Sequence, residues 1–473
     1  MKNKILIGIT LFSMFFGAGN LIFPPFLGAE AGTSGWLAFV GLSFSAVCFP
    51  ILGVVAVTLS GGADRMADRV HPMFSVVFIS ALYLAIGPCL AIPRTSGTSF
   101  SMAVQPFLSE GMPVGLVQFI YSIIFFTVAA RIALHPERLT EYLGKRLTPF
   151  LLTLIVIIFV VSLIHPTGSA AAPVGMYASA PVIHGFQYGY QTMDALAALT
   201  FGTVIALNIR EQGITEEKAV VKETISAGWI AGGCLILVYA MLNYVGMLAG
   251  GAFTGMENGT DVLLLTVHAL FGNTGTLVLA LVFLIACFNT CVSLLSCCGK
   301  YFNELFPQIS FPHWVFLFAG LSMLISNVGL NTILKVSVPV LNAIYPPALL
   351  LIFLTCINRW IKRYPKIYPW SAFLCCASSI TLMLEQQGIL VPLLLASDAR
   401  LYRRICMVCA NDCRDSGRTT SFCCRKQKHS KPLTAGKEGV KIFPILTPSF
   451  LLFFFYTLYV PAAVVPELPV QFV

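Results

Sequence analysis

The sequence predicts an all-α polytopic membrane protein with about twelve transmembrane helices, arranged as a five-plus-five inverted repeat. Three observations predict this class. Hydrophobic residues make up 57% of the 473 positions and charged residues only 10%, whereas a soluble domain carries charge at about 25% of its positions. Apolar stretches of spanning length recur along the chain. Two of these stretches are interrupted in their middle, at corresponding places in the two halves.

Twelve stretches approach the roughly 20 apolar residues that a bilayer core requires. They are Ile5–Gly28, Trp36–Leu59, Met73–Ile92, Pro113–Ala133, Phe150–Ile164, Ala195–Ile209, Thr224–Ala249, Thr276–Cys297, Trp314–Leu330, Val336–Cys356, Ser371–Ala396 and Phe443–Pro461. The first stretch follows two lysines, as a secretory signal does, but it is long and contains Pro24 and Pro25. We therefore expect a retained first helix.

The charge distribution predicts how these helices are oriented. If the N-terminus is cytoplasmic, the inner loops up to residue 369 hold sixteen Lys and Arg residues, whereas the outer loops hold only Arg94 and Lys335. Cytoplasmic loops of membrane proteins carry such an excess. The net charge of +9 is thus explained by membrane orientation, and no nucleic-acid partner is expected.

The two interrupted stretches fall in the first and sixth helices. The first contains the run FGAGNLIFPP at 16–25, and the second contains GYQTMDALAALTFG at 189–202. Lipid cannot satisfy the backbone groups that such breaks expose, so the breaks are expected to line a cavity within the protein. A unit of five helices enters the membrane from opposite sides in its two copies, so the halves 1–165 and 184–356 would bring both breaks together near mid-depth. Residues 357–396 form an eleventh helix outside the repeat.

Three motifs occur in order: FGAGNLIFPP, the segment GPCLAIPRT at 87–95, and GYQTMDALAALTFG. Together they resemble the branched-chain amino acid:cation symporter family, the bacterial branched-chain amino acid transport system II carriers, over roughly residues 1–395. This family belongs to the amino acid–polyamine–organocation superfamily, whose inverted-repeat fold matches the topology above. The resemblance implies uptake of leucine, isoleucine and valine at the bacterial cytoplasmic membrane, driven by Na⁺ or H⁺. It implies no enzymatic activity and no cofactor.

The first break offers a binding site for the substrate carboxylate. The backbone N–H groups of Gly17, Ala18 and Gly19 lie where the outer half-helix starts, and a helix N-terminus binds anions without a basic side chain. Glycine lets a ligand approach the backbone closely. Tight packing between helices through small residues is the alternative role for these three positions.

The second break is expected to bind the substrate ammonium through carbonyls of Tyr190, Gln191 and Thr192. Asp194 is the one acidic residue of this segment and carries two interpretations. It is a coupling residue for a proton or cation, because ionisable groups at membrane depth are costly, or it is an N-cap or first-turn residue of the following helix. The sequence favours the cap.

A cation needs oxygen ligands, which the first and eighth helices supply. The candidates are the Phe16 carbonyl, the Asn20 amide and the side chains of Asn289, Thr290 and Ser293. Thr290 and Ser293 are three residues apart and share a helix face. Asn289 departs from the hydroxyl residue that the family resemblance implies, although an amide oxygen also binds Na⁺. Hydrogen bonds from these hydroxyls to their own helix are the alternative.

The third helix adds Tyr83, whose hydroxyl either closes over the substrate carboxylate or packs in the core. Arg94 follows this helix and is expected at its outer end, against the membrane interface or a gate.

The chain changes character after Ala396. Residues 397–441 carry eleven Lys and Arg residues and five cysteines, at 406, 409, 413, 423 and 424. A basic tail outside the membrane contradicts the charge rule followed elsewhere, and an altered reading frame would explain this segment. A basic tail at the membrane surface is one alternative. A zinc site formed by Cys406 and Cys409 with Cys413, Cys423 or His429 is another, but the spacing matches no standard knuckle. Residues 442–473 contain the twelfth apolar stretch, whose orientation is open.

Two other functions share this composition: a channel for small neutral solutes and the permease subunit of an ATP-driven importer. No repeated carbonyl-filter or acidic-ring motif is visible, which argues against the channel. No GxxxxGK[ST] loop occurs, so an ATP-driven importer would need a separate ATPase. The sequence therefore favours a secondary transporter in contact with lipid, with Na⁺ favoured over H⁺ because neutral oxygen ligands outnumber titratable groups.

Overall fold

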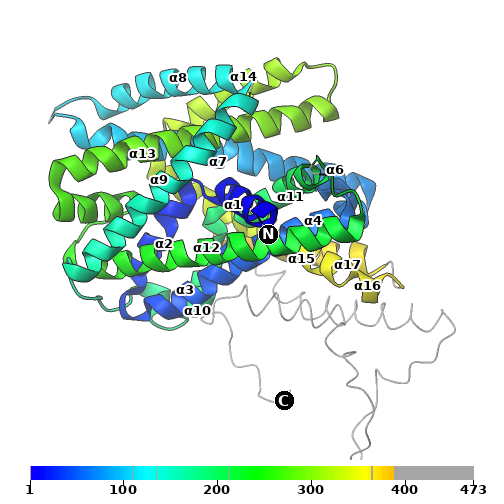
Figure 1. The fold of residues 1–473 in the computed structure, drawn as a ribbon, viewed down its shortest axis with the longest axis horizontal. Coiled ribbons are helices and arrows are strands. Elements are labelled where there is room, and N and C mark those ends of the chain that lie inside the picture. The colour runs from blue at the N-terminus through cyan, green and yellow to red at the C-terminus, as the bar shows by residue number, and fades with distance from the viewer. Residues whose placement is uncertain (1, 110, 135, 212, 364–365, 388–473) are drawn as a thin grey trace, which may run out of the picture. The chain divides into compact units, whose positions relative to one another are not determined.

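The computed structural model describes residues 2–109, 111–134, 136–211, 213–363 and 366–387. Regular structure in these residues is entirely helical (Figure 1), which confirms the all-α class. The chain divides into two compact units, Met1–Ala372 and Phe373–Val473. The packing described below belongs to the first unit.

The α-helices follow one another in the order α1 (Lys2–Phe15), α2 (Ala18–Ala31), α3 (Gly35–Ser43), α4 (Phe49–Ser60), α5 (Ala63–Ala67), α6 (Pro72–Leu84), α7 (Ala91–Ala103), α8 (Val114–Ala133), α9 (Pro136–Ile164), α10 (Pro181–Tyr188), α11 (Asp194–Glu211), α12 (Glu217–Ala252), α13 (Gly259–Leu305), α14 (Phe311–Ser326), α15 (Leu330–Cys356), α16 (Asn358–Ile361) and α17 (Ile367–Gln386). Short 3-10 turns are η1 (Gly32–Ser34), η4 (Gln105–Phe107), η5 (Gly175–Tyr177) and η6 (Gly189–Thr192), and two π-helical turns are η2 (Phe44–Cys48) and η3 (Ala85–Cys89).

Seven helical segments in the described residues are long and apolar enough to cross a membrane, and eight if the bent pair α10–α11 counts as one span. Two shorter apolar helices add to these. Large apolar side chains such as Leu116, Ile124 and Trp229 are exposed, as expected for surfaces in contact with lipid. A many-spanning protein is therefore confirmed. The count of twelve stays a prediction, because the segment 443–461 lies outside the described residues.

Two predicted spans have the wrong ends. The span Met73–Ile92 instead continues through the π turn η3 and α7 to Ala103, so Arg94 does not follow the helix but lies within it. The span Thr276–Cys297 belongs to α13, whose 47 residues bend at Gly272, where φ is 63°. The first error has a clear cause: hydropathy falls at polar residues such as Arg94 and Thr95, and α7 continues through them because the fold buries them.

The two broken spans pack reciprocally. The first, α1 and α2, packs against α12, which follows the second broken span; the second, α10 and α11, packs against α3 and α4, which follow the first. A five-plus-five repeat related by a two-fold axis requires this exchange of partners. The labelled helices α1, α11 and α12 lie close together in Figure 1.

Glycines make these contacts very close. A methyl group on Gly28, Gly246 or Gly250 would overlap a backbone carbonyl across the α2–α12 contact. The same is true of Gly41 and Gly185 between α3 and α10. Without a side chain, the backbones approach far nearer than usual, which is how helices in membranes associate tightly. One half of each broken span, α2 in the first and α10 in the second, is thereby fixed to a neighbouring helix.

Candidate functional site

The first break lies between α1 and α2, at Phe16 and Gly17. Gly17 is extended, with φ −109° and ψ −173°, and no side chain caps α2. The first amides of α2, beginning with Ala18 and Gly19, therefore have no acceptor within the helix and give this end a partial positive charge. The prediction that all three N–H groups are exposed is wrong for Gly17, whose N–H donates to the Phe15 carbonyl at 2.8 Å.

Side chains from two other helices fill the space beside the glycines of this break. A methyl group on Gly17 would lie 3.2 Å from Thr290 Oγ1 on α13, and one on Gly19 would lie 2.7 Å from Arg94 Nη2 on α7. The structure therefore brings one predicted cation ligand, Thr290, to the first break. It also places there an arginine that sequence reasoning located elsewhere.

The second break is formed by η6 and Met193, which adopts a left-handed conformation with φ 62° and ψ 11°. Such a conformation is uncommon outside glycine and is often found at functional sites. Two of the carbonyls predicted to be free are not. The Tyr190 carbonyl accepts from Met193 N at 3.0 Å, and the Gln191 carbonyl accepts from Arg94 Nη1 at 2.6 Å. The Gln191 side chain accepts from Ser337 on α15 at 2.9 Å.

Arg94 joins the two breaks. It is 5% exposed, lies against Gly19, stacks over the Phe23 ring with Cζ 5.1 Å from its centroid and bonds to Gln191 as described above. The expectation that it meets an interface or gate at the end of its helix is wrong, because α7 continues for about nine residues beyond it. The signal that could have located it is the motif GPCLAIPRT, which contains the arginine itself.

Asp194 lies in the first turn of α11, which is one of the two helix-start positions that the sequence offered for it, and it does not cap the helix. It is the first residue of that helix, and its Oδ2 accepts from Asn20 Nδ2 at 2.7 Å and from Tyr239 OH at 3.2 Å. Asn20 Nδ2 also donates to the Tyr239 hydroxyl. The Asp194 amide donates to Thr192 Oγ1 at 3.5 Å, so the Thr192 hydroxyl is the side-chain acceptor at the start of α11. All three members of the Asn20–Asp194–Tyr239 cluster are buried, so the cluster links α2, α11 and α12.

The remaining cation candidates, Phe16, Asn289, Thr290 and Ser293, have different surroundings, and no hydrogen bond among their oxygen atoms is seen in the described residues. The Thr290 hydroxyl donates to the Ala286 carbonyl of its own helix at 3.0 Å, which is the alternative that the sequence left open. Asn289 Oδ1 is buried without a hydrogen-bond partner, and Ser293 is half-buried. The Phe16 ring stacks on the preceding turn of α1. Of the three candidates on α13, Thr290 is the one whose side chain lies beside Gly17.

Tyr83 lies apart from the breaks. Its ring stacks on Tyr301 of α13 with centroids 4.1 Å apart. Tyr301 is eleven residues beyond Thr290 on the same helix, which is about 16 Å along the axis. The structure therefore does not place Tyr83 beside the other substrate candidates.

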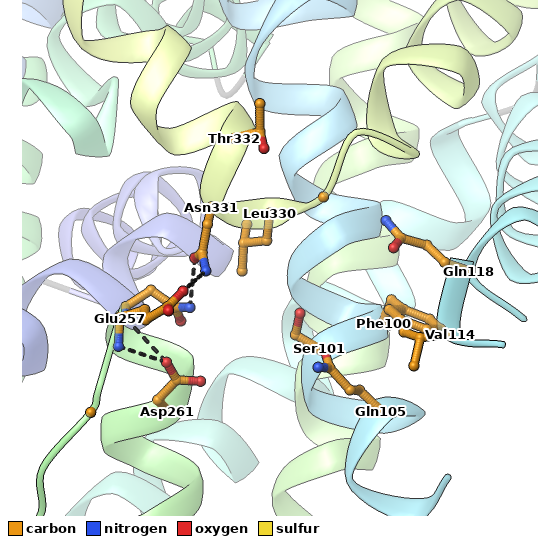
Figure 2. A pocket seen from close by; sticks show the side chains of 13 residues that line it. Phe100, Ser101, Gln105, Val114, Gln118, Glu257, Asp261, Leu330, Asn331 and Thr332 are labelled. Atoms are coloured by element: carbon orange, nitrogen blue, oxygen red, sulfur yellow. Dashed lines mark hydrogen bonds between the residues drawn. The ribbon is translucent and has the colours of Figure 1, made fainter. Parts of the chain in front are cut away.

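A polar cavity of about 450 Å³ lies where α7 ends and α13 and α15 begin (Figure 2). Phe100 lines it and is six residues beyond Arg94 on α7, or about 9 Å along the helix. Ser337, which bonds to Gln191, is similarly six residues beyond Asn331 on α15. The cavity therefore lies about two helical turns from the level of the two breaks.

Polar side chains close one wall of this cavity. Asn258 caps α13 and donates from Nδ2 to Asn331 Oδ1 at 2.9 Å. Asn331 in turn donates to the Glu257 carboxylate, and the Asp261 carboxylate accepts from the Glu257 amide at 2.9 Å. Figure 2 shows Asn331 reaching across to these residues. The start of α15 is thereby tied to the start of α13.

The family model and the curated relatives agree on one family. The family described as branched-chain amino acid transport protein matches residues 1–402. Curated relatives include the branched-chain amino acid permease BrnQ of Bacillus subtilis, 40% identical over 81% of this chain and 88% of the relative. They also include the branched-chain amino acid transport system 2 carrier protein of Pseudomonas aeruginosa, 39% identical over 77% of this chain and 83% of the relative.

Solved structures show a similar fold at low sequence identity. A nucleobase-cation-symport-1 family transporter in a closed conformation, with bromovinylhydantoin bound, is 10% identical with a TM-score of 0.51, over 82% of this chain and 94% of that one. A mutant manganese transporter of Eremococcus coleocola is 13% identical with a TM-score of 0.52, over 85% of this chain and 92% of that one. The relatives are transporters and not enzymes, as the sequence predicts, and the chain belongs to the branched-chain amino acid transport protein family.

Proposed function

We propose that this chain imports leucine, isoleucine and valine across the bacterial cytoplasmic membrane by symport with a cation, and that Na⁺ is favoured over H⁺. The observation that carries the proposal is the meeting of two broken spans around Arg94, with Gly19 on one side and the Gln191 carbonyl on the other. Broken helices at such a meeting point bind substrates in secondary transporters. The relatives' names supply the substrate class.

The break offers complementary charge to an α-amino acid. The start of α2 is positive and suits the carboxylate, and the end of α1 is negative and suits the ammonium or a cation. Apolar rings stand next to it: Phe15 on α1 contacts Phe201 on α11 with centroids 5.7 Å apart, and Tyr190 stacks on Tyr345 at 4.3 Å. These rings suit a branched aliphatic side chain.

For coupling, Na⁺ requires a set of oxygen ligands and H⁺ requires a group that titrates. Thr290 beside Gly17, with Asn289 and Ser293 on the same helix, supports the first. Coupling to H⁺ would instead need Asp194 as the group that titrates. Sodium is favoured because Asn289 Oδ1 is a buried acceptor without a hydrogen-bond partner, and a cation would satisfy it.

Uptake of labelled leucine into proteoliposomes tests this proposal, under an imposed Na⁺ gradient and, separately, under an imposed pH gradient. Thr290→Ala should raise the Na⁺ concentration for half-maximal uptake several-fold. Thr266→Ala is a matched control, because Thr266 also lies on α13 and donates to its own helix, at 2.7 Å to the Val262 carbonyl. Full uptake on a pH gradient without Na⁺, lost in Asp194→Asn, would assign coupling to protons.

Counterflow without ATP separates a carrier from the other classes. Exchange of labelled for unlabelled leucine in protein-only vesicles supports a carrier. A folded protein that shows uptake without exchange would indicate a channel, and one that needs an added ATPase would indicate a permease subunit.

A further inference from the structure

Arg94 is a buried cation without a direct anionic partner among the described residues. Its Nη1 donates to the Gln191 carbonyl, and its Cζ lies over the Phe23 ring. Asp194 is the one carboxylate among the described residues that interacts with it electrostatically, and that carboxylate bonds to Asn20 and Tyr239 instead. A guanidinium has five N–H donors, and burying a charge without a counter-ion is costly. A bound anion would lower that cost.

The position of the guanidinium identifies the kind of anion. Arg94 Nη2 lies against Gly19, in the first turn of α2, where the helix N-terminus presents amides and positive partial charge. A carboxylate at this point would meet the planar fork of the arginine and the helix amides together, an arrangement that arginine favours over lysine. A phosphate would fit the same donors, but the adjoining rings of Phe23 and Tyr188, 5.6 Å apart, suit a smaller and partly apolar ligand.

We propose that Arg94 binds the α-carboxylate of the transported amino acid and so selects for ligands that carry one. This inference rests on the proposed function. It also gives Gly19 a different role from the one that the sequence suggests, because the glycine makes room for the guanidinium as well as for the ligand. The hydrogen bond to the Gln191 carbonyl orients the guanidinium toward the first break. It also connects a ligand bound there to the second broken span.

The experiment measures equilibrium binding of leucine and of leucinamide, which keeps the ammonium and side chain but lacks the carboxylate. Purified protein in nanodiscs is used, and melting temperatures are recorded for each variant. Wild type should bind leucine much more tightly than leucinamide. Arg94→Gln should weaken leucine binding about tenfold or more and leave leucinamide unchanged, so that the ratio between the two ligands falls.

Arg94→Lys keeps the positive charge but removes the planar fork of the guanidinium. Its ratio of leucine to leucinamide affinity should therefore lie between those of wild type and Arg94→Gln. This variant also tests the proposal if Arg94→Gln does not fold. Arg69→Gln is the matched control, because Arg69 also lies over a ring, that of Tyr368 at 5.9 Å, and donates to the Tyr368 hydroxyl at 3.4 Å. It should leave both affinities unchanged.

Two outcomes would overturn the assignment. If Arg94→Gln weakens both ligands equally, the arginine is structural. If Arg94→Gln with Asp194→Asn restores leucine binding, Arg94 serves only to balance Asp194. Failure of the folded wild type to bind leucine would instead contradict the proposed function.

Discussion

Alanine at Gly19 and alanine at Gly17 add the same methyl group to the same break, and the structure predicts unequal effects. The methyl at 19 would lie 2.7 Å from Arg94 Nη2 and 3.3 Å from Cζ, whereas the methyl at 17 would lie 3.2 Å from Thr290 Oγ1. The optimal separation of such atoms is about 3.5 Å or more. The guanidinium therefore has to move by most of an ångström, but the threonine hydroxyl by only a few tenths.

Movement of the guanidinium disturbs its 2.6 Å bond to the Gln191 carbonyl and its place beside the α2 amides. A hydrogen bond to a charged group contributes about 1.5–3 kcal/mol, which corresponds to about 10- to 150-fold in affinity for leucine. For Gly17→Ala we expect a loss of about threefold or less, or about 0.7 kcal/mol. Backbone strain does not enter, because Gly17 has a φ of −109° and Gly19 lies in a helix, where alanine is favoured.

The assay is equilibrium binding of labelled leucine to each variant in nanodiscs, with melting temperatures as the check on folding. Valine at either position should abolish uptake while insertion in the membrane persists, since its larger side chain cannot be accommodated beside Thr290 or Arg94. The reasoning is refuted if Gly19→Ala binds leucine like wild type, or if Gly17→Ala is the weaker binder of the two.

Three further results are expected. Isoleucine and valine should compete with leucine for uptake whereas lysine and glutamate should not, because the rings beside the break suit an aliphatic side chain; equal competition by lysine would contradict this. Tyr239→Phe should lower the free energy of unfolding by about 1–3 kcal/mol, because it removes the hydroxyl that bonds both Asn20 and Asp194; an unchanged melting temperature would show that the cluster is not stabilising. Asn331→Ala should speed hydrogen exchange at the start of α13, since that side chain bonds both Asn258 and Glu257; unchanged exchange would mean that the tie is unimportant.

The positions of both breaks could be predicted from the sequence, because their cause is local. Gly17 directly precedes α2, and Met193 separates η6 from α11. Each lies in a run of residues that interrupts an apolar stretch. The same local reasoning explains the all-α class. A break in an apolar segment needs no knowledge of its neighbours to be recognised.

The contacts of Arg94 and Asp194 could not be predicted, because their partners are distant in the chain. An arginine after an apolar stretch looks like the end of a span unless one knows that Gln191, 97 residues away, provides an acceptor. An aspartate in the first turn of a helix can be predicted from the sequence, but its hydrogen bonds to Asn20 and Tyr239 cannot, because those residues are 174 and 45 positions away. Hydropathy and capping preferences describe single segments, whereas buried polar residues are paired by the tertiary fold.

The close packing of α2 on α12 has a consequence for movement. Carbonyls of one helix occupy the space above glycines of the other at Gly28, Gly246 and Gly250, so sliding or separating these helices would break close backbone contacts between residues 25–29 of α2 and residues 243–250 of α12. At the other side of the break, the atoms nearest to Gly8 of α1 belong to the Ile230 side chain of α12 and not to a backbone carbonyl. We therefore expect α2 and α12 to travel as one rigid body during transport, with Gly17 as the hinge about which α1 swings.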